Sequence, residues 1–509
     1  MSNFNRRDFL KLAGMLPLGL VAPKLSKSFG LQSGKKNVII VVFDAFTAYN
    51  MSLHGYGRET TPNIARLAER ATVYHNHYAG GNYTTPGTAS LLTGTYPWTH
   101  RALKPNGIVS DEYVDQNIFS VFKDYYSIAY SHNEWANTLF EQFKENIDEF
   151  IPREQLTLFS SDWLVKKVFP NDDDISSVGW SRNIKIQEEG YAYSLFLSRI
   201  VSALEERYSA QYRAQFPRGL MPTTRTDGGF LLEHAVDWIV ERIQAAPAPV
   251  FGYFHFFPPH DPYRAPFEFS GKFNNDGYKR DDKPADVFAT EQYFNRKMEL
   301  DALRQNYDEF ILYVDREFKR MFDLLENAGQ LENTILVLTS DHGEMFERGI
   351  AKHDTNALYE PILRIPLLIF EPGVTTRTDV RAPTSAVDLL PTLAHLSGLP
   401  APQWTEGLLL PPYQQTGTSA DRSIYAVRSY DAETTDVLTQ ASIVLVKGRY
   451  KLHYYFGYAE IGGGDLIKLF DVQADPGEVN DLSQSHKDLA SEMLQELKAR
   501  LAETNEPYL

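Results

Sequence analysis

Acidic residues and a histidine stand where apolar runs of the sequence end. Asp44 follows the run of residues 37–43, and Asp341 and His342 follow soon after the run of residues 334–339. If these runs are parallel strands, their polar side chains meet at one edge of a sheet, where open α/β sheets bind ligands. Buried carboxylates beside an imidazole need a cation, so the pattern indicates a metal site. Asp44 and Asp341 could also be helix caps or turn residues.

The apolar runs predict strands that are buried on both faces. Residues 37–43 (NVIIVVF) and 334–339 (TILVLT) are rich in β-branched side chains, as is typical of a parallel sheet. Residues 249–257 and 364–370 predict two further strands. Helical spacing of apolar residues predicts helices between the strands: one capped by Thr61 that begins at Pro62, one from Ala89 after a loop at 82–88, one over 306–328 and one over 386–397. This alternation predicts an α/β fold, a mostly parallel sheet flanked by helices.

The pattern changes after residue 400. A proline- and glycine-rich linker precedes antiparallel-looking strands at 443–446 and 450–455 and a helix at 487–502. We therefore expect a main domain over residues 36–400 and a smaller C-terminal α+β subdomain over residues 419–509. Residues 136–235 are irregular and aromatic-rich. They predict an insertion, either a lid beside the site or a helical layer on the sheet.

Composition narrows the class of partner. The chain has 509 residues and a formal net charge of −16. This charge argues against nucleic acid, because binding a phosphate backbone draws on clustered Lys and Arg. A small anionic substrate remains compatible, since a metal ion can supply local positive charge. The chain has no cysteine, which excludes disulfides, thiolate ligands and a cysteine nucleophile.

The N-terminus carries a targeting pattern. Arg6 and Arg7 precede Asp8-Phe9-Leu10-Lys11 and a short apolar run. This pattern resembles a twin-arginine export signal, which we place over residues 1–30. The apolar run is about half of the ~20 residues that span a bilayer. The resemblance implies export by the twin-arginine machinery to the periplasm or the exterior; the alternative is an amphipathic helix with a chance Arg pair.

A specific motif lies at residues 82–97, which read NYTTPGTASLLTGTYP. It resembles the sulfatase signature, Cys/Ser-x-Pro-x-Arg followed by Ala-Ser-Leu-Leu-Thr-Gly. The shared Ala-Ser-Leu-Leu-Thr-Gly segment fixes the register, so Thr84 takes the nucleophile position and Thr88 takes that of the Arg. Other segments match the sulfatase-like branch of the alkaline phosphatase superfamily in order: residues 37–44, 255–263, 340–344, 358–367 and 450–478.

The resemblance covers residues 36 to about 485 and implies an alkaline-phosphatase-like fold with a smaller C-terminal α+β subdomain. It also implies one divalent metal ion, held by Asp44, Thr84, Asp341 and His342. An imidazole among oxygen ligands favours Mn or Zn, with Mg or Ca as alternatives.

Several departures from the sulfatase pattern bear on the mechanism. Sulfatases convert Cys or Ser at the nucleophile position to formylglycine, and threonine is not a substrate for that maturation. The supporting Arg is Thr88, the second Asp of the usual pair is Ala45, and a Lys expected near residues 131–133 is missing. Related phosphodiesterases and phospho-group transferases use a Thr nucleophile. The resemblance therefore implies a covalent ester at Thr84, activated by the metal.

Four histidines are further candidates. His260 and His353 are predicted to be catalytic, with His260 binding the anion or protonating the leaving group. His255 and His132 are predicted to contact substrate. For His255, a packed strand histidine without a functional role is the alternative.

Taken together, these features predict a metal-dependent hydrolase of sulfate, phosphodiester or phosphonate esters that acts on a small anionic ester. The alternatives are a phospho-group transferase with the same first step, a sulfatase that works without formylglycine, and an inactive binding homologue. The sequence does not indicate an oligomeric state.

Overall fold

The central element is a nine-stranded sheet, seen in a computed structural model that describes residues 34–158, 203, 206–222, 229–279, 282–290, 297–414 and 422–509. The predicted export signal and about half of the predicted insertion lie outside these ranges. The sheet runs in the spatial order β12 (Thr378–Val380), β2 (Thr72–Tyr78), β11 (Arg364–Phe370), β8 (Thr334–Thr339), β1 (Asn37–Phe43), β7 (Val250–Phe256), β3 (Tyr126–Ser131) and β4 (Glu149–Phe150), with β13 (Thr384–Ser385) also paired to β2.

The pairing is mainly parallel, as the apolar runs predict. β1 pairs in parallel with both β7 and β8, and β3 pairs in parallel with β7 and β4. Only β11 runs against its neighbours, β2 and β8. The fold class expected from the sequence is confirmed. Because β1 lies between β7 and β8, the carboxyl ends of these three strands meet at one edge.

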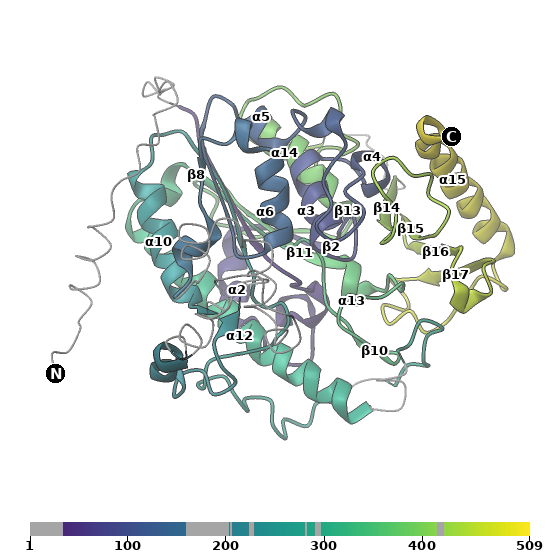
Figure 1. Cartoon of the computed structure of the whole chain (residues 1–509), viewed down its shortest axis with the longest axis horizontal. Coiled ribbons are helices and arrows are strands. Elements are labelled where there is room, and N and C mark those ends of the chain that lie inside the picture. Colours follow the sequence, from purple (N-terminus) through teal and green to yellow (C-terminus); the bar gives the residue numbers. More distant parts are fainter. Residues whose placement is uncertain are drawn as a thin grey trace, which may run out of the picture.

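Alternate residues of β1 belong to two different cores. Ile39, Val41 and Phe43 pack in the core that includes residues of three helices, α2 (Pro62–Leu67), α10 (Leu232–Ala245) and α12 (Lys297–Asn327). The residues between them face the opposite core, and their sheet face is covered by α3 (Thr84–Thr93), α5 (Ile118–Val121), α6 (Glu134–Gln142) and α14 (Leu389–Leu396). Figure 1 shows α12 and α3 on opposite sides of the strands. The period-2 alternation of a strand therefore builds a three-layer structure.

The start of one predicted helix and the cap of another differ from the structure. α3 begins at Thr84 rather than Ala89, so the expected loop is the first part of a helix. The side chain of Thr61 makes no cap hydrogen bond at α2. Instead, the Asp315 carboxylate of α12 accepts from the backbone N–H groups of Asn63 (3.0 Å) and Ile64 (2.7 Å). A distant carboxylate supplies the cap that the local sequence pattern assigned to Thr61.

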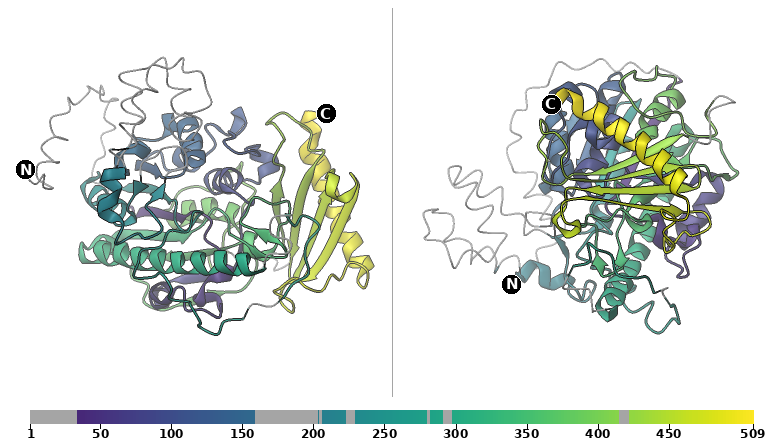
Figure 2. Two further views of the ribbon diagram at one scale, coloured as in Figure 1. Left: turned by 60° about the horizontal axis from the view of Figure 1, so that its bottom comes forward. Right: turned by 90° about the vertical axis from the view of Figure 1, so that its right-hand side faces the viewer.

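The C-terminal part has its own antiparallel sheet of β14 (Ser423–Arg428), β15 (Ala441–Lys447), β16 (Tyr450–Phe456) and β17 (Asp465–Asp471). Helix α15 (Lys487–Asn505) covers one face with Met493 and Leu497. The other face packs against α13 (Glu360–Leu363) of the main part. In Figure 2 this sheet and α15 form one end of the molecule.

Buried charges join the two parts. Lys451 of β16 has no exposed side-chain surface and lies 3.0 Å from both Glu360 and Glu478. Glu478 also contacts His453 at 2.9 Å and accepts from the backbone N–H of Glu360 at 2.7 Å. Burial alone would raise the pKa of Glu478, but Lys451 and His453 hold it well below its ordinary value. Glu478 is therefore ionised, and its contacts with Lys451 and with the backbone of Glu360 fix β16 against α13.

Candidate active site

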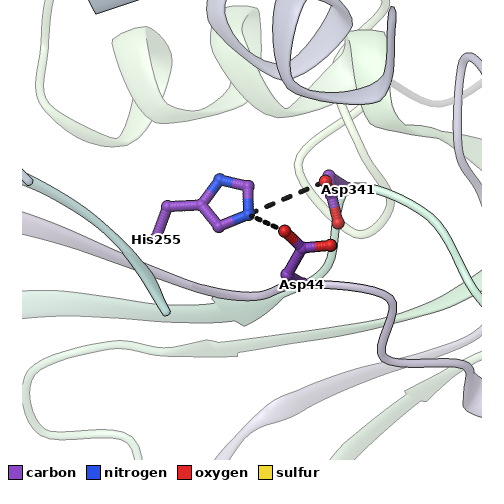
Figure 3. A group of neighbouring side chains, drawn as sticks. All are labelled: Asp44, His255 and Asp341. Carbon is purple, nitrogen blue, oxygen red and sulfur yellow. Dashed lines mark ion pairs between the residues drawn. The ribbon is translucent and has the colours of Figure 1, made fainter. Parts of the chain in front are cut away.

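The carboxyl edge of the sheet carries a cluster of polar side chains. Asp44 directly follows β1, His255 is the second-last residue of β7, and Asp341 follows β8 by two residues. The register of β1 places Val42 beside both His255 and Thr339, so the three side chains emerge together. Figure 3 shows the His255 ring pointing toward both carboxylates.

The distances within this cluster are short. Nε2 of His255 lies 3.3 Å from Oδ2 of Asp44 and 3.7 Å from Oδ2 of Asp341. One ligand atom from each of these three residues lies within 4.8 Å of the other two. Nε2 of His342 approaches from another side, 3.3 Å from Asp44 Oδ1 and 3.6 Å from Asp341 Oδ2. All four side chains are fully buried.

These donor atoms fit a metal ion. Oδ1 of Asp44, Oδ2 of Asp341, and Nε2 of both His255 and His342 are buried without a hydrogen-bond partner in the described part of the chain. Buried polar atoms are normally paired, and two buried carboxylates strongly favour a cation between them. Mixed imidazole and carboxylate donors suit a divalent first-row metal.

The electrostatics of the cluster agree with this fit. Burial by itself would raise the pKa of Asp44, yet His260, His255 and His342 hold it well below its ordinary value. Burial would lower the pKa of His342, but Asp341 and Asp44 raise it to about 9. The two carboxylates therefore create a negative potential that holds positive charge.

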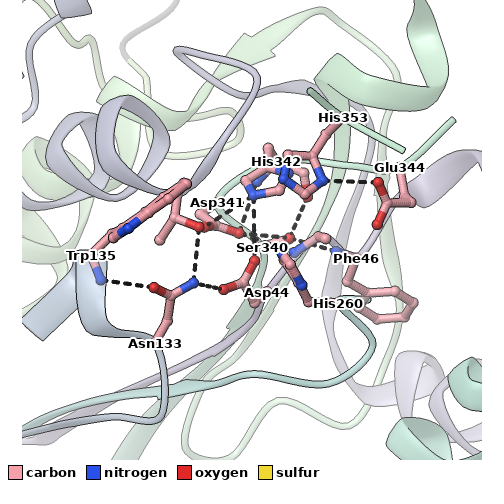
Figure 4. A network of polar contacts seen from close by, with 12 residues as sticks. Asp44, Phe46, Asn133, Trp135, His260, Ser340, Asp341, His342, Glu344 and His353 are labelled. Carbon is pink, nitrogen blue, oxygen red and sulfur yellow. Dashed lines mark hydrogen bonds and ion pairs between the residues drawn. The ribbon is translucent and has the colours of Figure 1, made fainter. Parts of the chain in front are cut away.

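Thr84 lies at the start of α3 and is linked to this cluster by Asn133. Nδ2 of Asn133 lies 3.0 Å from Oγ1 of Thr84 and 2.5 Å from Oδ2 of Asp44. The orientation of the amide is fixed, because its Oδ1 accepts from the backbone N–H of Trp135 at 2.8 Å and so caps α6. The nitrogen must then face Thr84 and Asp44. Figure 4 shows this amide between Trp135 and Asp44.

A glycine allows α3 to approach the cluster. A Cβ atom on Gly87 would lie only 2.2 Å from the carbonyl oxygen of Asp341. No larger residue fits at this contact without a backbone shift. The first turn of α3, with Thr84, is thereby packed against the backbone of Asp341.

Two predicted catalytic histidines lie beside His342. The ring centroids of His353 and His342 are 4.3 Å apart, and those of His353 and His260 are 4.9 Å apart. Nδ1 of His353 lies 2.8 Å from Oε1 of Glu344, which accepts its hydrogen. Nδ1 of His260 lies 2.6 Å from the carbonyl oxygen of Asp261. Since Nδ1 of His260 must donate to this carbonyl, Nε2 is the atom left for substrate.

His132 and His255 lie deeper than a substrate contact usually requires. The His132 ring stacks on Phe230 at 3.8 Å, is fully buried, and has no hydrogen-bond partner at either nitrogen within the described residues. His255 lies with the carboxylates, where Nε2 is also placed to bind a metal ion. Their predicted roles in substrate binding stay predictions.

Comparison with known proteins decides the family. The sequence profile named Sulfatase matches residues 36–399, which is most of the chain. This chain belongs to the sulfatase family. A second profile, the C-terminal part of N-sulphoglucosamine sulphohydrolase, matches residues 349–507. The protein is accordingly a hydrolase of sulfuric or phosphoric esters.

Individual relatives are distant but span most of the chain. A choline-sulfatase of Rhizobium meliloti is 23% identical over 89% of this chain and 84% of its own length. A multifunctional alkaline phosphatase superfamily protein of Trinickia caryophylli is 24% identical over 88% of this chain and 91% of its own. The structure of a phosphonate monoester hydrolase of Agrobacterium radiobacter matches with a TM-score of 0.65 at 18% identity, covering 93% of this chain and 96% of that one. The structural likeness shows the shared fold.

Two residues of the site, Asn133 and Glu344, are not among the predicted ones. Asn133 follows β3 by two residues, at the same sheet edge as Asp44, so the rule that identifies Asp44 also applies to it. Asn is an ordinary helix cap as well, and Asn133 does cap α6. Glu344 is fully buried, and burial raises its pKa to about 7. The sequence feature that points to Glu344 is its position two residues after His342.

Proposed function

We propose that this protein hydrolyses sulfate esters, phosphodiesters or phosphonate esters through a covalent intermediate on Thr84. The observation that carries this proposal is the Asn133 amide, which contacts both the Thr84 hydroxyl and Asp44 of the buried carboxylate cluster. A Thr with only a structural role would not need a hydrogen-bond donor that also contacts a buried carboxylate. The nucleophile and the charged cluster therefore form one unit.

One divalent ion, Mn or Zn by preference, would be held by Asp44, Thr84, Asp341 and His342, with His255 as a further candidate ligand. When bound, it would lower the pKa of the Thr84 hydroxyl and neutralise charge on the ester oxygens. The orphaned donor atoms of the cluster support this assignment.

The residues of the chain have separate tasks in the reaction. Thr84 releases its proton to water, and Oγ1 forms a bond to sulfur or phosphorus while the bond to the leaving oxygen breaks. His260 donates a proton from Nε2 to that oxygen. A water molecule then attacks the same sulfur or phosphorus, the bond to Thr84 breaks, and Oγ1 regains a proton. Asn133 donates to Oγ1 and stabilises the developing negative charge.

Other residues orient these groups. His353 donates to Glu344, which fixes its ring next to His260 and His342. Burial and the neighbouring cations lower the pKa of His353 well below its ordinary value, so it serves as a neutral hydrogen-bonding group. His255 and His132 complete the proposed set as contacts of substrate.

The substrate is a small sulfated or phosphorylated ester. Relatives named choline-sulfatase and phosphonate monoester hydrolase support both ester classes, and one structure of similar fold was solved with D-glucosamine-2-N,6-O-disulfate. Among the described residues, no helix combines the length and apolar character needed to cross a bilayer. We also propose export through the twin-arginine signal at residues 1–30, and the division into domains at 36–400 and 419–509.

A comparison of Thr84→Ala with Thr85→Ala tests the nucleophile. Thr85 is the next residue of α3 and is equally buried, so it is a matched control. Metal-loaded proteins are assayed against an aryl sulfate, an aryl phosphate, a phosphodiester and a phosphonate ester. We expect turnover to fall at least ~10³-fold in Thr84→Ala and to stay within a few-fold in Thr85→Ala. Activity that survives in Thr84→Ala would remove the proposal.

The same assay separates the two ester classes. Faster phosphodiester or phosphonate turnover supports a phosphorus ester as the substrate. Dominant sulfate turnover indicates a sulfatase that works without formylglycine. Intact-mass measurement of a quenched reaction should show the ester group attached to the wild-type chain and absent from Thr84→Ala.

A further inference from the structure

A second polar pocket lies where the main sheet meets the C-terminal sheet. Its volume is about 340 Å³. The main part contributes His54, His75, Arg364 and Arg381, and the C-terminal part contributes Gly448 and Gln473 among others. None of the pocket's residues belongs to the metal cluster or to α3, so it is a separate place on the molecule.

The cationic groups of this pocket are incompletely paired. Nε of Arg364 is buried without a hydrogen-bond partner in the described part of the chain. Its nearest carboxylate, Glu360, is 3.8 Å away and is shared with Lys451 at 3.0 Å. Arg381 is exposed, and no carboxylate of the described residues pairs with it. The buried Nε of Arg364 indicates a missing acceptor, and Arg381 adds a guanidinium group that no described carboxylate neutralises.

Two histidines line the pocket beside these arginines. Nδ1 of His54 lies 3.2 Å from Nδ1 of His75, whose Nε2 donates to Asp379 at 2.5 Å. Burial lowers the pKa of His75, so its ring is neutral and its Nδ1 accepts from Nδ1 of His54. The donors of the pocket are therefore the two guanidinium groups, and the histidines hold Asp379 away from them.

The potential in the pocket is positive. Burial lowers the pKa of His54 well below its ordinary value, and Arg364, His75 and Arg377 lower it further, while only Asp379 opposes them. This concentration of cations occurs in a chain whose formal net charge is −16. A cation as the ligand is therefore disfavoured, and an anion is favoured.

We infer that this pocket binds a compact oxyanion of the sulfate or phosphate type, at a site separate from the catalytic one. Guanidinium groups bind tetrahedral oxyanions through paired N–H donors, and Arg364 and Arg381 supply two guanidinium groups with open donors. The anion is either free in solution or part of a larger sulfated or phosphorylated molecule. Because the pocket is lined by both parts of the chain, the bound anion also joins them.

Substitution of Arg381 tests this site with Arg377 as the matched control. Arg377 is close in the sequence and pairs with Asp379, but it does not line the pocket. The metal-loaded full chain is titrated calorimetrically with sodium sulfate and with sodium phosphate. We expect at least tenfold weaker binding at one site in Arg381→Gln and wild-type binding in Arg377→Gln. The competitive inhibition constant of sulfate, which reports the catalytic site, should be the same in all three proteins.

A second titration identifies the source of the anion. It uses a non-hydrolysable sugar sulfonate in place of the inorganic salt. Weaker binding of the inorganic anion in Arg381→Gln identifies a free oxyanion, and weaker binding of the sulfonate alone identifies a group carried by a larger molecule. Both results support the pocket. If Arg381→Gln binds every probe as the wild type does, the inference is wrong.

Arg364→Gln provides an independent variant, because it removes the guanidinium group whose Nε has no partner in the described part of the chain. We expect it to weaken sulfate binding severalfold. The sulfate-dependent rise in the thermal unfolding midpoint should shrink in both Arg364→Gln and Arg381→Gln, since the anion stabilises the folded chain only where it binds. An unchanged rise in both variants contradicts the inference.

Discussion

The side-chain nitrogen of Asn133 lies 3.0 Å from the hydroxyl oxygen of Thr84. The contact is fixed from the other side of the amide, because Oδ1 of Asn133 accepts from the N–H of Trp135. One side chain thus caps a helix and orients the proposed nucleophile. The two tasks can be separated by substitution, since other residues can cap a helix without carrying an amide nitrogen.

We predict that Asn133→Ser lowers kcat/KM by ~10²–10³-fold, the usual effect of losing one donor to a developing oxyanion. Ser caps helices well, so α6 should remain folded, as circular dichroism and the unfolding midpoint will show. The acidic limb of the pH–rate profile should move to higher pH, because the nucleophile loses a stabilising donor. Wild-type kinetics in this variant would exclude the positioning role.

The proposed metal site provides a second prediction. Asp341→Asn keeps the size of the side chain but removes a charge from the cluster. Elemental analysis should find about one Mn or Zn per chain in the wild type and in the exposed control Asp465→Asn, and much less in Asp341→Asn. Chelation should lower the unfolding midpoint, because free metal at a thousandfold excess over Kd stabilises a protein by about 4 kcal/mol. Equal metal content in both variants would contradict the assigned site.

The buried pair at Lys451 should matter far more for stability than a surface pair. Lys451→Met leaves Glu360 and Glu478 buried without their cation, which typically costs about 3–5 kcal/mol. Lys498 is the control, because it lies 2.9 Å from Asp465 with both side chains about half exposed. Lys498→Met should change the free energy of unfolding by no more than ~1 kcal/mol. Denaturant titrations of the two variants measure the difference directly, and similar losses would argue against a buried charge network.

His453 makes stability depend on pH. Burial lowers its pKa from 6.5 to about 4, although Glu478 opposes the change. Between these two values the unfolded chain binds a proton that the folded chain does not, so stability rises with pH through this window and is complete above pH 6.5. The effect is on the order of 3 kcal/mol.

Denaturation at pH 4.5, 5.5 and 7 tests this prediction with His453→Gln. The variant should lose less stability than the wild type on acidification, because it lacks the group that protonates on unfolding. The exposed residue His486 supplies the control His486→Gln, which should follow the wild type. A wild-type slope in His453→Gln would disprove the assignment.

The sequence predicted the strands of the sheet better than the details of the site. The bounds of β1, β8 and β11 agree with the predicted runs, because a continuous apolar, β-branched segment can be buried only in the centre of a sheet. The start of α3 was missed because Thr84-Thr85-Pro86-Gly87-Thr88 contains poor helix formers. Contact between Gly87 and the backbone of Asp341 positions this turn, and that contact joins residues far apart in the chain.

Long-range contacts also explain the other differences. The cap of α2 comes from Asp315, and the Thr84 hydroxyl meets Asn133 across the site. Neither pairing has a signature in local spacing. Asp44, Asp341 and His342 could be predicted together because each follows a strand of the same sheet, whereas the position of His255 beside them depends on the register between β1 and β7.

The contact between Glu478 and Glu360 has a consequence for how the protein is made. Glu478 holds the start of α13, and the carbonyl oxygens of Pro361 and Ile362 accept from the N–H groups of Glu344 and Gly343, next to His342. On the ribosome, these residues emerge long before Glu478 does. The loop that carries His342 therefore waits until Glu478 has been translated before its bracing is complete, and a nascent chain that stops short of Glu478 lacks this contact.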